Sequence, residues 1–139
     1  MEFEEISKDL QETFLRLYKE NLNICESILE DDRWIYPILR INSASEPKLI
    51  SMQSQDNKAD FDIMIKKVKE ILNSQSFDTA SLSYSSSSVL KNSDALVTYL
   101  VDKSGVGALY FTAYHFKGLL KKKVVFDKHL LGAVIDNAL

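Results

Sequence analysis

The sequence contains very little cysteine, proline, glycine or histidine. Cys25 is the only cysteine among 139 residues, so an intramolecular disulfide is excluded, and a lone thiol fits a reducing compartment. Four glycines and two prolines are too few for a collagen-like or low-complexity chain. The only histidines, His115 and His129, show no spacing with Cys25 that is typical of a zinc site. We therefore expect neither a metal ion nor another cofactor.

Two kinds of segment that direct a chain to a membrane are also missing. The first residues, Met1 to Glu5, are acidic, whereas a secretory signal begins with positive charge followed by an apolar stretch. The longest apolar runs are interrupted by charge or serine within about eight residues, far below the ~20 residues that span a bilayer. These absences predict a cytoplasmic protein with no membrane partner.

The composition that is present is that of an ordinary globular domain. Hydrophobic residues make up 45% and charged residues 27% of the chain, and the formal net charge is −3. A chain of this length buries enough apolar surface to fold without disulfides, so we predict a single α+β domain over residues 1–139. Residues 1–40 hold ten acidic and five basic side chains, whereas residues 76–139 hold five and seven. The overall acidity disfavours nucleic acid as a partner, because affinity for phosphates depends on clustered lysine and arginine.

Helical periodicity predicts two amphipathic helices in the first half of the chain. Apolar residues recur every three or four positions over residues 3–30, and again over residues 61–72 after an N-cap at residues 56–57. The poor helix formers in Asn21–Asn23 leave open whether the first helix is continuous or split. The acidic pair at residues 31–32 predicts that this helix ends there, since negative charge is disfavoured at a helix C-terminus.

Alternating and β-branched segments predict strands in the rest of the chain. These segments are residues 34–41, 48–54, 77–84, 95–101, 108–116 and 123–127. Pro37 cannot donate a ladder hydrogen bond, so the first strand is expected at an edge or with a bulge. Residues 130–139 are spaced for a short helix, although Gly132 weakens that pattern. We predict an α+β two-layer sandwich, a mostly antiparallel sheet with a long N-terminal helix and a second central helix, in the order α-β-β-α-β-β-β-β-α.

No segment has the spacing of a catalytic motif. Gly105–Gly107 lacks the pattern of a phosphate-binding loop and is interpreted as a hairpin loop. Ser85–Ser88 has hydroxyls but no adjacent histidine or lysine to activate one, and is interpreted as a flexible loop. Cys25 lies on the apolar stripe of the first helix, where a buried structural thiol is expected. The chain is therefore predicted not to be an enzyme; an enzyme using His115 or His129 with distant carboxylates is the least favoured hypothesis.

The aromatic residues of the predicted strands give the most suggestive pattern. Tyr110 and Tyr114 share one face of their strand, with Phe116 beyond them, and Tyr84 and Tyr99 come from neighbouring strands. We predict that these five residues form an interaction face. The strands at residues 95–101 and 108–116 are apolar on both alternating faces, so a single layer of helices would leave one face for a second protomer or a partner.

Lysines concentrate at one place in the sequence. Lys121, Lys122 and Lys123 are consecutive, and Lys117 and Lys128 flank them. Such a group is predicted to contact an anion or an acidic partner.

These observations lead to two main hypotheses for function. The first is a non-enzymatic protein-interaction module that self-associates as a homodimer or other homo-oligomer through the aromatic face or the first helix. One version of it is an immunity-like or antitoxin-like protein, for which small size, acidity and an α+β fold are compatible features. The alternative is a small-ligand or nucleotide-binding domain that holds an anion with Lys121, Lys122 and Lys123 near the Gly105–Gly107 loop.

Overall fold

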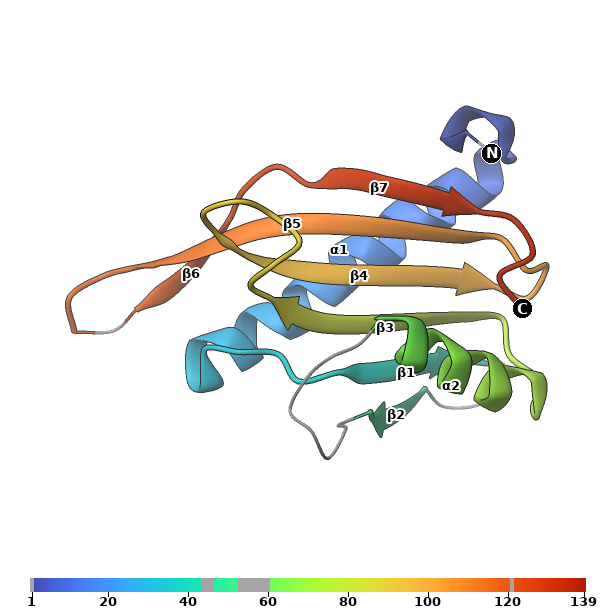
Figure 1. Ribbon diagram of the computed structural model, residues 1–139, viewed down its shortest axis with the longest axis horizontal. Helices are drawn as coiled ribbons and strands as arrows, with labels where there is room; N and C mark the ends of the chain where they lie inside the picture. Colours follow the sequence, from blue (N-terminus) through green and yellow to red (C-terminus); the bar gives the residue numbers. More distant parts are fainter. Residues whose placement is uncertain (1, 44–46, 53–60, 121) are drawn as a thin grey trace.

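An antiparallel β-sheet with a helix on each face forms the protein (Figure 1). The structure is a computed structural model that describes residues 2–43, 47–52, 61–120 and 122–139. The strands within these residues are β1 (Ile38–Asn42), β2 (Lys48–Ser51), β3 (Thr79–Ser86), β4 (Asp94–Asp102), β5 (Gly107–Lys117), β6 (Lys123–Phe126) and β7 (Leu130–Ile135). They lie in the order β2-β1-β3-β4-β5-β6, and β7 pairs with β5 beside β6.

The long N-terminal helix, α1 (Lys8–Asp32), follows a 3₁₀ turn, η1 (Phe3–Glu5). Ser7 caps α1, since its hydroxyl accepts a hydrogen bond from the Leu10 N–H at 3.2 Å. The helix ends at Arg33, whose φ of 62° is left-handed and whose N–H donates to the Leu29 carbonyl. It is continuous through the asparagines, and the Asn21 side-chain amide donates to the Leu17 carbonyl at 2.8 Å. None of the described helices is both long and apolar enough to cross a bilayer.

The central helix, α2 (Phe61–Asn73), confirms the helix predicted from the second periodic segment. Met64, Val68 and Leu72 form its buried stripe, and they pack on the opposite face of the sheet from α1. The N-cap expected at residues 56–57 lies outside the described residues. Figure 1 shows α1 behind the sheet and α2 in front of β3 and β1.

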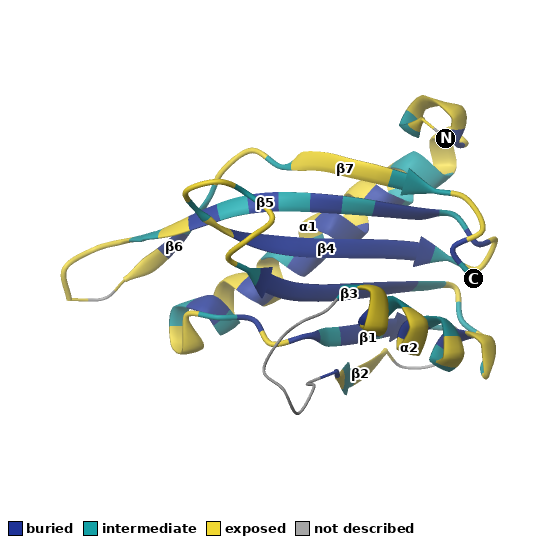
Figure 2. Ribbon diagram, in the orientation of Figure 1, coloured by how far each residue is buried: buried dark blue, intermediate teal, exposed yellow. Residues whose placement is uncertain are grey.

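Strand register determines which side chains face each helix. Leu82 of β3 pairs with Tyr99 of β4, and both belong to the cluster that packs against α2. The alternate residues of β4, Leu96 and Leu100, pack against α1. Leu100 pairs in turn with Ala108 of β5, which lies in the same cluster. Because β4 is apolar on both faces, it requires a helix on each, and it is buried along nearly its whole length (Figure 2).

The α+β class, the antiparallel sheet and both long helices of the prediction are confirmed. The predicted helix over residues 130–139 is wrong, because residues Leu130–Ile135 form β7. In addition, the two helices cover opposite faces, so the sheet lies between them rather than in one half of a two-layer sandwich. Tertiary context overrides helical spacing here: the free edge of β5 offers backbone partners to an uncharged segment.

Two smaller expectations also differ from the structure. Trp34–Pro37 precede β1 instead of belonging to it, so the proline does not place β1 at an edge; β1 pairs with β2 on one side and β3 on the other. Ser85 and Ser86 are part of β3 rather than of a flexible loop. The Ser85 hydroxyl accepts from the Ile35 N–H at 2.9 Å, which fixes the segment leading into β1 against β3.

Candidate interaction surface

The predicted aromatic face is divided between the two sides of the sheet. Tyr84 and Tyr99 pack in the cluster beneath α2, whereas Tyr110 and Tyr114 pack beneath α1. All four are buried, with exposed fractions of 2–4%. They therefore form no common outer surface, and this chain's own helices supply the cover that the sequence left to a partner. An interaction role for these residues stays a prediction.

The α1 face owes its cohesion to hydrogen bonds as well as to apolar contacts. The hydroxyls of Tyr18 on α1 and Thr112 on β5 are 2.5 Å apart, and the Tyr114 hydroxyl donates to Ser85 at 2.9 Å. Arg40 of β1 reaches Glu20 of α1 at 3.3 Å. Such partners satisfy buried polar groups, and they fix the position of α1 along the strands.

A second set of buried polar groups lies nearer the middle of α1. The Asn21 carbonyl oxygen accepts from Ser81 at 3.1 Å and from Ser83 at 3.4 Å. By contrast, the Thr98 and Tyr110 hydroxyls are buried and find no hydrogen-bond partner within the described part of the chain. These two residues are cross-strand partners in the β4–β5 ladder. The α1 face is thus polar at its centre and incompletely satisfied there.

Burial keeps the ionisable groups of this interior neutral. It raises the pKa of the Cys25 thiol to about 12, in spite of an opposing hydrogen bond with Ser83. It raises the pKa of Tyr99 to about 12 as well, and it also raises the pKa of Tyr110. A thiol protonated at neutral pH is a poor nucleophile, so the buried Cys25 fits a structural role.

The histidines lie apart from any metal-binding cluster. His115 is exposed on β5, whereas His129 is half-buried, with its ring 4.7 Å from that of Tyr18 and 5.5 Å from that of Tyr110. Within residues 2–43, 47–52, 61–120 and 122–139, no three histidine, cysteine or acidic residues come close enough to hold a metal ion. His129 serves instead to close the aromatic cluster at the edge of α1.

The Gly105–Gly107 segment is a hairpin loop between β4 and β5. The Asp102 carboxylate accepts from the N–H groups of Ser104 and Val106, and Gly105 has a φ of 90°. Lys123 lies at the other end of β5, where it pairs with Lys117, and Lys122 precedes it. Since β5 is an extended strand of 11 residues, it is about 33 Å long. The glycine loop and these lysines do not share a site, and Lys121 lies outside the described residues.

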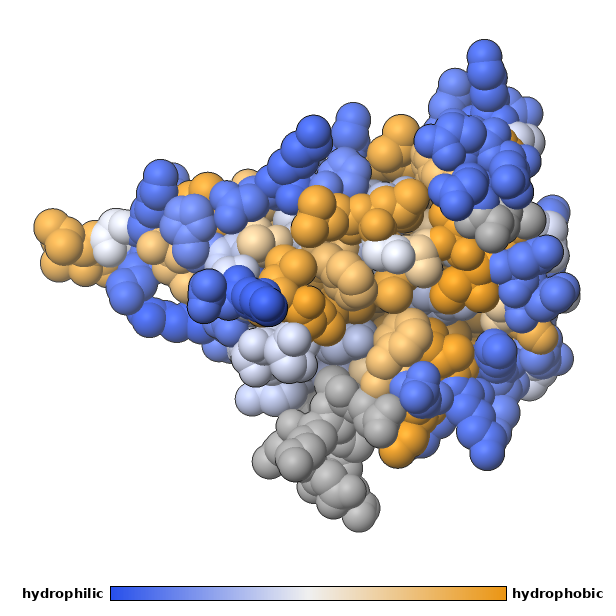
Figure 3. All heavy atoms as spheres, turned by 45° about the horizontal axis from the view of Figure 1, so that its top comes forward, coloured by the Kyte–Doolittle hydropathy of each residue, from blue (hydrophilic) through white to orange (hydrophobic). Residues whose placement is uncertain are grey.

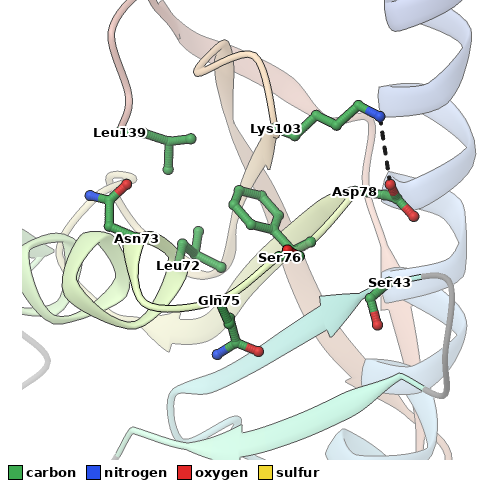
Figure 4. A pocket seen from close by; sticks show the side chains of 9 residues that line it. Ser43, Leu72, Asn73, Gln75, Ser76, Asp78, Lys103 and Leu139 are labelled. Carbon is green, nitrogen blue, oxygen red and sulfur yellow. Dashed lines mark ion pairs between the residues drawn. The ribbon is translucent and has the colours of Figure 1, made fainter.

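A cavity of about 520 Å³ lies beside the end of α2 (Figure 4). Leu72 and Phe77 line it together with polar side chains that include Asn73 and Gln75. Its charged lining residues, Asp78 and Lys103, are 3.8 Å apart and pair with each other. Both are largely exposed, and the cavity contains none of the residues singled out in the sequence.

Strands β5 and β7 carry apolar side chains that the helices cover only in part. Leu130 and Leu131 of β7 are 55% and 43% exposed, and Leu109 and Phe111 of β5 are only half-buried on the α2 face. Figure 3 turns the β7 edge forward and shows hydrophobic atoms gathered across the middle of this side of the molecule. Among the described strands β7 pairs with β5 alone, so its outer edge is free.

The edge strands β2 and β7, on opposite sides of the sheet, differ in how well they are protected against pairing with another chain. β2 is short and is preceded by Pro47 and begun by Lys48, features that discourage pairing with another chain. β7 carries no charge and no proline over Leu130–Ile135. We refer to the free edge of β7 together with Leu109 and Phe111 as the β7 surface.

Sequence reasoning missed the β7 surface, because it interpreted residues 130–139 as a helix. The signal that was present is the contiguous uncharged run from Leu130 to Ile135, which fits a strand as well as it fits a helix. Gly132 was a second signal. A Cβ at that position would come within 2.5 Å of the Phe111 ring, so any other residue where β7 bulges against β5 would require that ring to move.

Comparison with known proteins adds no identification. No protein-family model, no curated protein and no solved structure matches this chain.

Proposed function

We propose that this chain is a protein-interaction module that self-associates by pairing β7 with β7 of a second copy. The observation that carries the proposal is the free, uncharged edge of β7 with two exposed leucines on it. An edge of this kind presents unpaired N–H and C=O groups that form a template for another strand.

A second copy fits this edge because antiparallel pairing of identical strands is self-complementary. Rotation about a twofold axis between two β7 strands gives both copies the same contacts and closes the assembly at two. Like charges would repel across such an axis, and β7 has none. Homodimerisation would extend the sheet of each copy into one continuous antiparallel sheet.

Side chains on both faces of β7 support the same arrangement. Leu130 lies opposite Phe111 on the α2 face, whereas Leu131 lies opposite Tyr110 on the α1 face. Stable interfaces bury about 1,600 Å² in total, more than a six-residue strand pair supplies alone. The half-buried Leu109 and Phe111 must therefore contribute, and we expect a dimer that dissociates in the micromolar range.

Measurement of molar mass by light scattering coupled to size-exclusion chromatography tests the proposal. The wild-type chain has a mass of 15.9 kDa, and we expect twice that value at high concentration. Leu130→Lys places a charge on the β7 edge and is expected to give the monomer. Leu49→Lys is the matched control, since Leu49 is 66% exposed on the opposite edge strand, β2, and this variant should remain dimeric.

Thermal melting of both variants verifies that each is folded. A wild-type chain that is monomeric at every concentration would overturn the proposal, and so would a Leu130→Lys variant that dimerises as strongly as wild type. The immunity-like or antitoxin-like version stays a prediction.

A further inference from the structure

We propose that the end of the β5–β6 hairpin inserts into the surface of an anionic lipid bilayer. The described residues of the hairpin tip are Leu119 and Leu120, with Lys117, Lys122 and Lys123 beside them. It projects from the body of the sheet at the left of Figure 1, and its far end is hydrophobic in Figure 3. This contact is independent of the β7 surface, which adjoins the other half of β5.

Folding buries none of the apolar surface of the two leucines at the tip. Leu119 and Leu120 are 100% and 103% exposed, whereas the next most exposed large hydrophobic residue of the described chain, Leu49, is 66% exposed. Gly118 precedes them with a φ of 116°, which turns the chain at the end of β5. Adjacent leucines without any apolar contact of their own indicate a surface that another phase or molecule covers.

The lysines of the tip are also arranged unfavourably for the isolated protein. Lys117 and Lys123 are direct cross-strand partners at the last position of the β5–β6 ladder, where like charges repel. Lys122 adds a third charge next to them. The ion pairs found among the described residues, Arg40 with Glu20 and Lys103 with Asp78, involve none of these lysines.

Contact with an anionic bilayer would both bury the exposed leucines and neutralise the repulsion between the lysines. Phosphate and carboxylate headgroups neutralise the lysines, and the acyl boundary just below them takes up the leucines. The order of residues matches that layering: the Lys117–Lys123 pair is at the base of the tip and the leucines are beyond it. A protein partner would need a concave, acidic pocket to surround a convex tip, whereas a fluid bilayer adapts to it.

The rest of the chain orients this contact. The formal net charge of the whole protein is −3 although the tip is basic, so an anionic surface repels the body and attracts the hairpin. Contact of this kind is peripheral and requires no spanning helix. The proposal therefore differs from the expectation of no membrane partner, which was based on the missing signal segment and the missing apolar run.

Co-sedimentation with vesicles tests the proposal on the full chain. We expect binding to vesicles of phosphatidylcholine and phosphatidylserine at a ratio of about 2:1, decreasing as salt is added, and little binding to phosphatidylcholine alone. The double variant Lys122→Ser/Lys123→Ser should bind the anionic vesicles about 30-fold more weakly, at about 1 kcal/mol for each lysine. Leu119→Ser/Leu120→Ser should weaken binding at least tenfold.

The matched control is Lys66→Ser/Lys67→Ser, which makes the same change of charge at exposed positions of α2 and should bind like wild type. Melting temperatures verify that all variants are folded. Absence of wild-type binding to the anionic vesicles would overturn the proposal. Equal losses in the control and the tip variants would overturn the assignment to the tip, and unchanged binding of the leucine variant would overturn insertion.

Discussion

The two faces of the sheet are covered in different ways. The 25-residue α1 crosses its face and combines apolar contacts with hydrogen bonds to Ser81, Ser83 and Thr112. The 13-residue α2 covers an apolar face, and it leaves Leu109 and Phe111 half-buried. Hydrogen bonds to the strands restrain α1 in place, whereas the shorter α2 leaves part of the other face uncovered.

The largest expected effect contrasts a leucine on each face. Leu100 is fully buried beneath α1, so Leu100→Ala should lower the free energy of unfolding by about 2–5 kcal/mol through lost contacts and a cavity. Leu109→Ala on the α2 face should cost about 1 kcal/mol or less, because Leu109 is only half-buried in the monomer. Urea denaturation under monomeric conditions measures both. Equal losses would show that the α2 face is covered as well as the α1 face.

A smaller effect on the free energy of unfolding distinguishes a hydroxyl that has a hydrogen-bond partner on the α1 face from one that has none. Thr112 and Thr98 are both fully buried, but only the Thr112 hydroxyl has a partner, Tyr18. Thr112→Val leaves the Tyr18 hydroxyl unpaired and should destabilise by about 1–3 kcal/mol. Thr98→Val removes an unpaired hydroxyl and should stabilise by up to about 1 kcal/mol. Urea denaturation measures both free energies of unfolding, and a similar loss in the two variants would contradict the assigned hydrogen bonding.

The smallest effect appears only at alkaline pH. Burial on the α2 face raises the pKa of Tyr99 from 10.0 to about 12, so the folded state retains a proton that the unfolded state loses. The stability that this provides is complete below pH 10 and is lost as pH rises through about 12. Tyr99→Phe should therefore make the decline in stability over that range shallower. Melting temperatures recorded at a series of pH values measure this slope.

Tyr114→Phe is the matched variant on the α1 face. It removes the hydrogen bond to Ser85 and should already lose about 1 kcal/mol at neutral pH, where Tyr99→Phe has little effect. An unchanged alkaline slope in Tyr99→Phe would contradict the buried, neutral state of Tyr99.

Local pattern was sufficient to predict α1, α2 and the central hairpin. The three-to-four spacing of Leu10, Phe14 and Leu17 predicts α1, and Phe14 and Leu17 are buried in it. Asp102 and Gly105 predict the hairpin loop that joins β4 to β5, because their chemistry acts within a few residues. Such features depend on near neighbours in the chain, which the sequence displays directly.

The candidate surfaces could not be predicted from local pattern, because their positions depend on contacts between residues far apart in the chain. Alternation places Tyr110 and Tyr114 on one side of β5, but only the pairing of Tyr99 with Leu109 shows that Tyr99 faces the other way. A register shifted by one residue would reverse that relation. Likewise, the run Leu130–Ile135 became a strand because β5 had a free edge to receive it.

The sequence by itself determined the α+β composition of the fold, the two amphipathic helices and the buried thiol at Cys25, since these follow from periodicity and side-chain chemistry. Only the tertiary structure decided that the helices take opposite faces, that the tyrosines are divided between them, and that β7 and the hairpin tip remain uncovered. Burial and edge pairing are shared properties of segments far apart in the chain, and they exist only once strand register has been set.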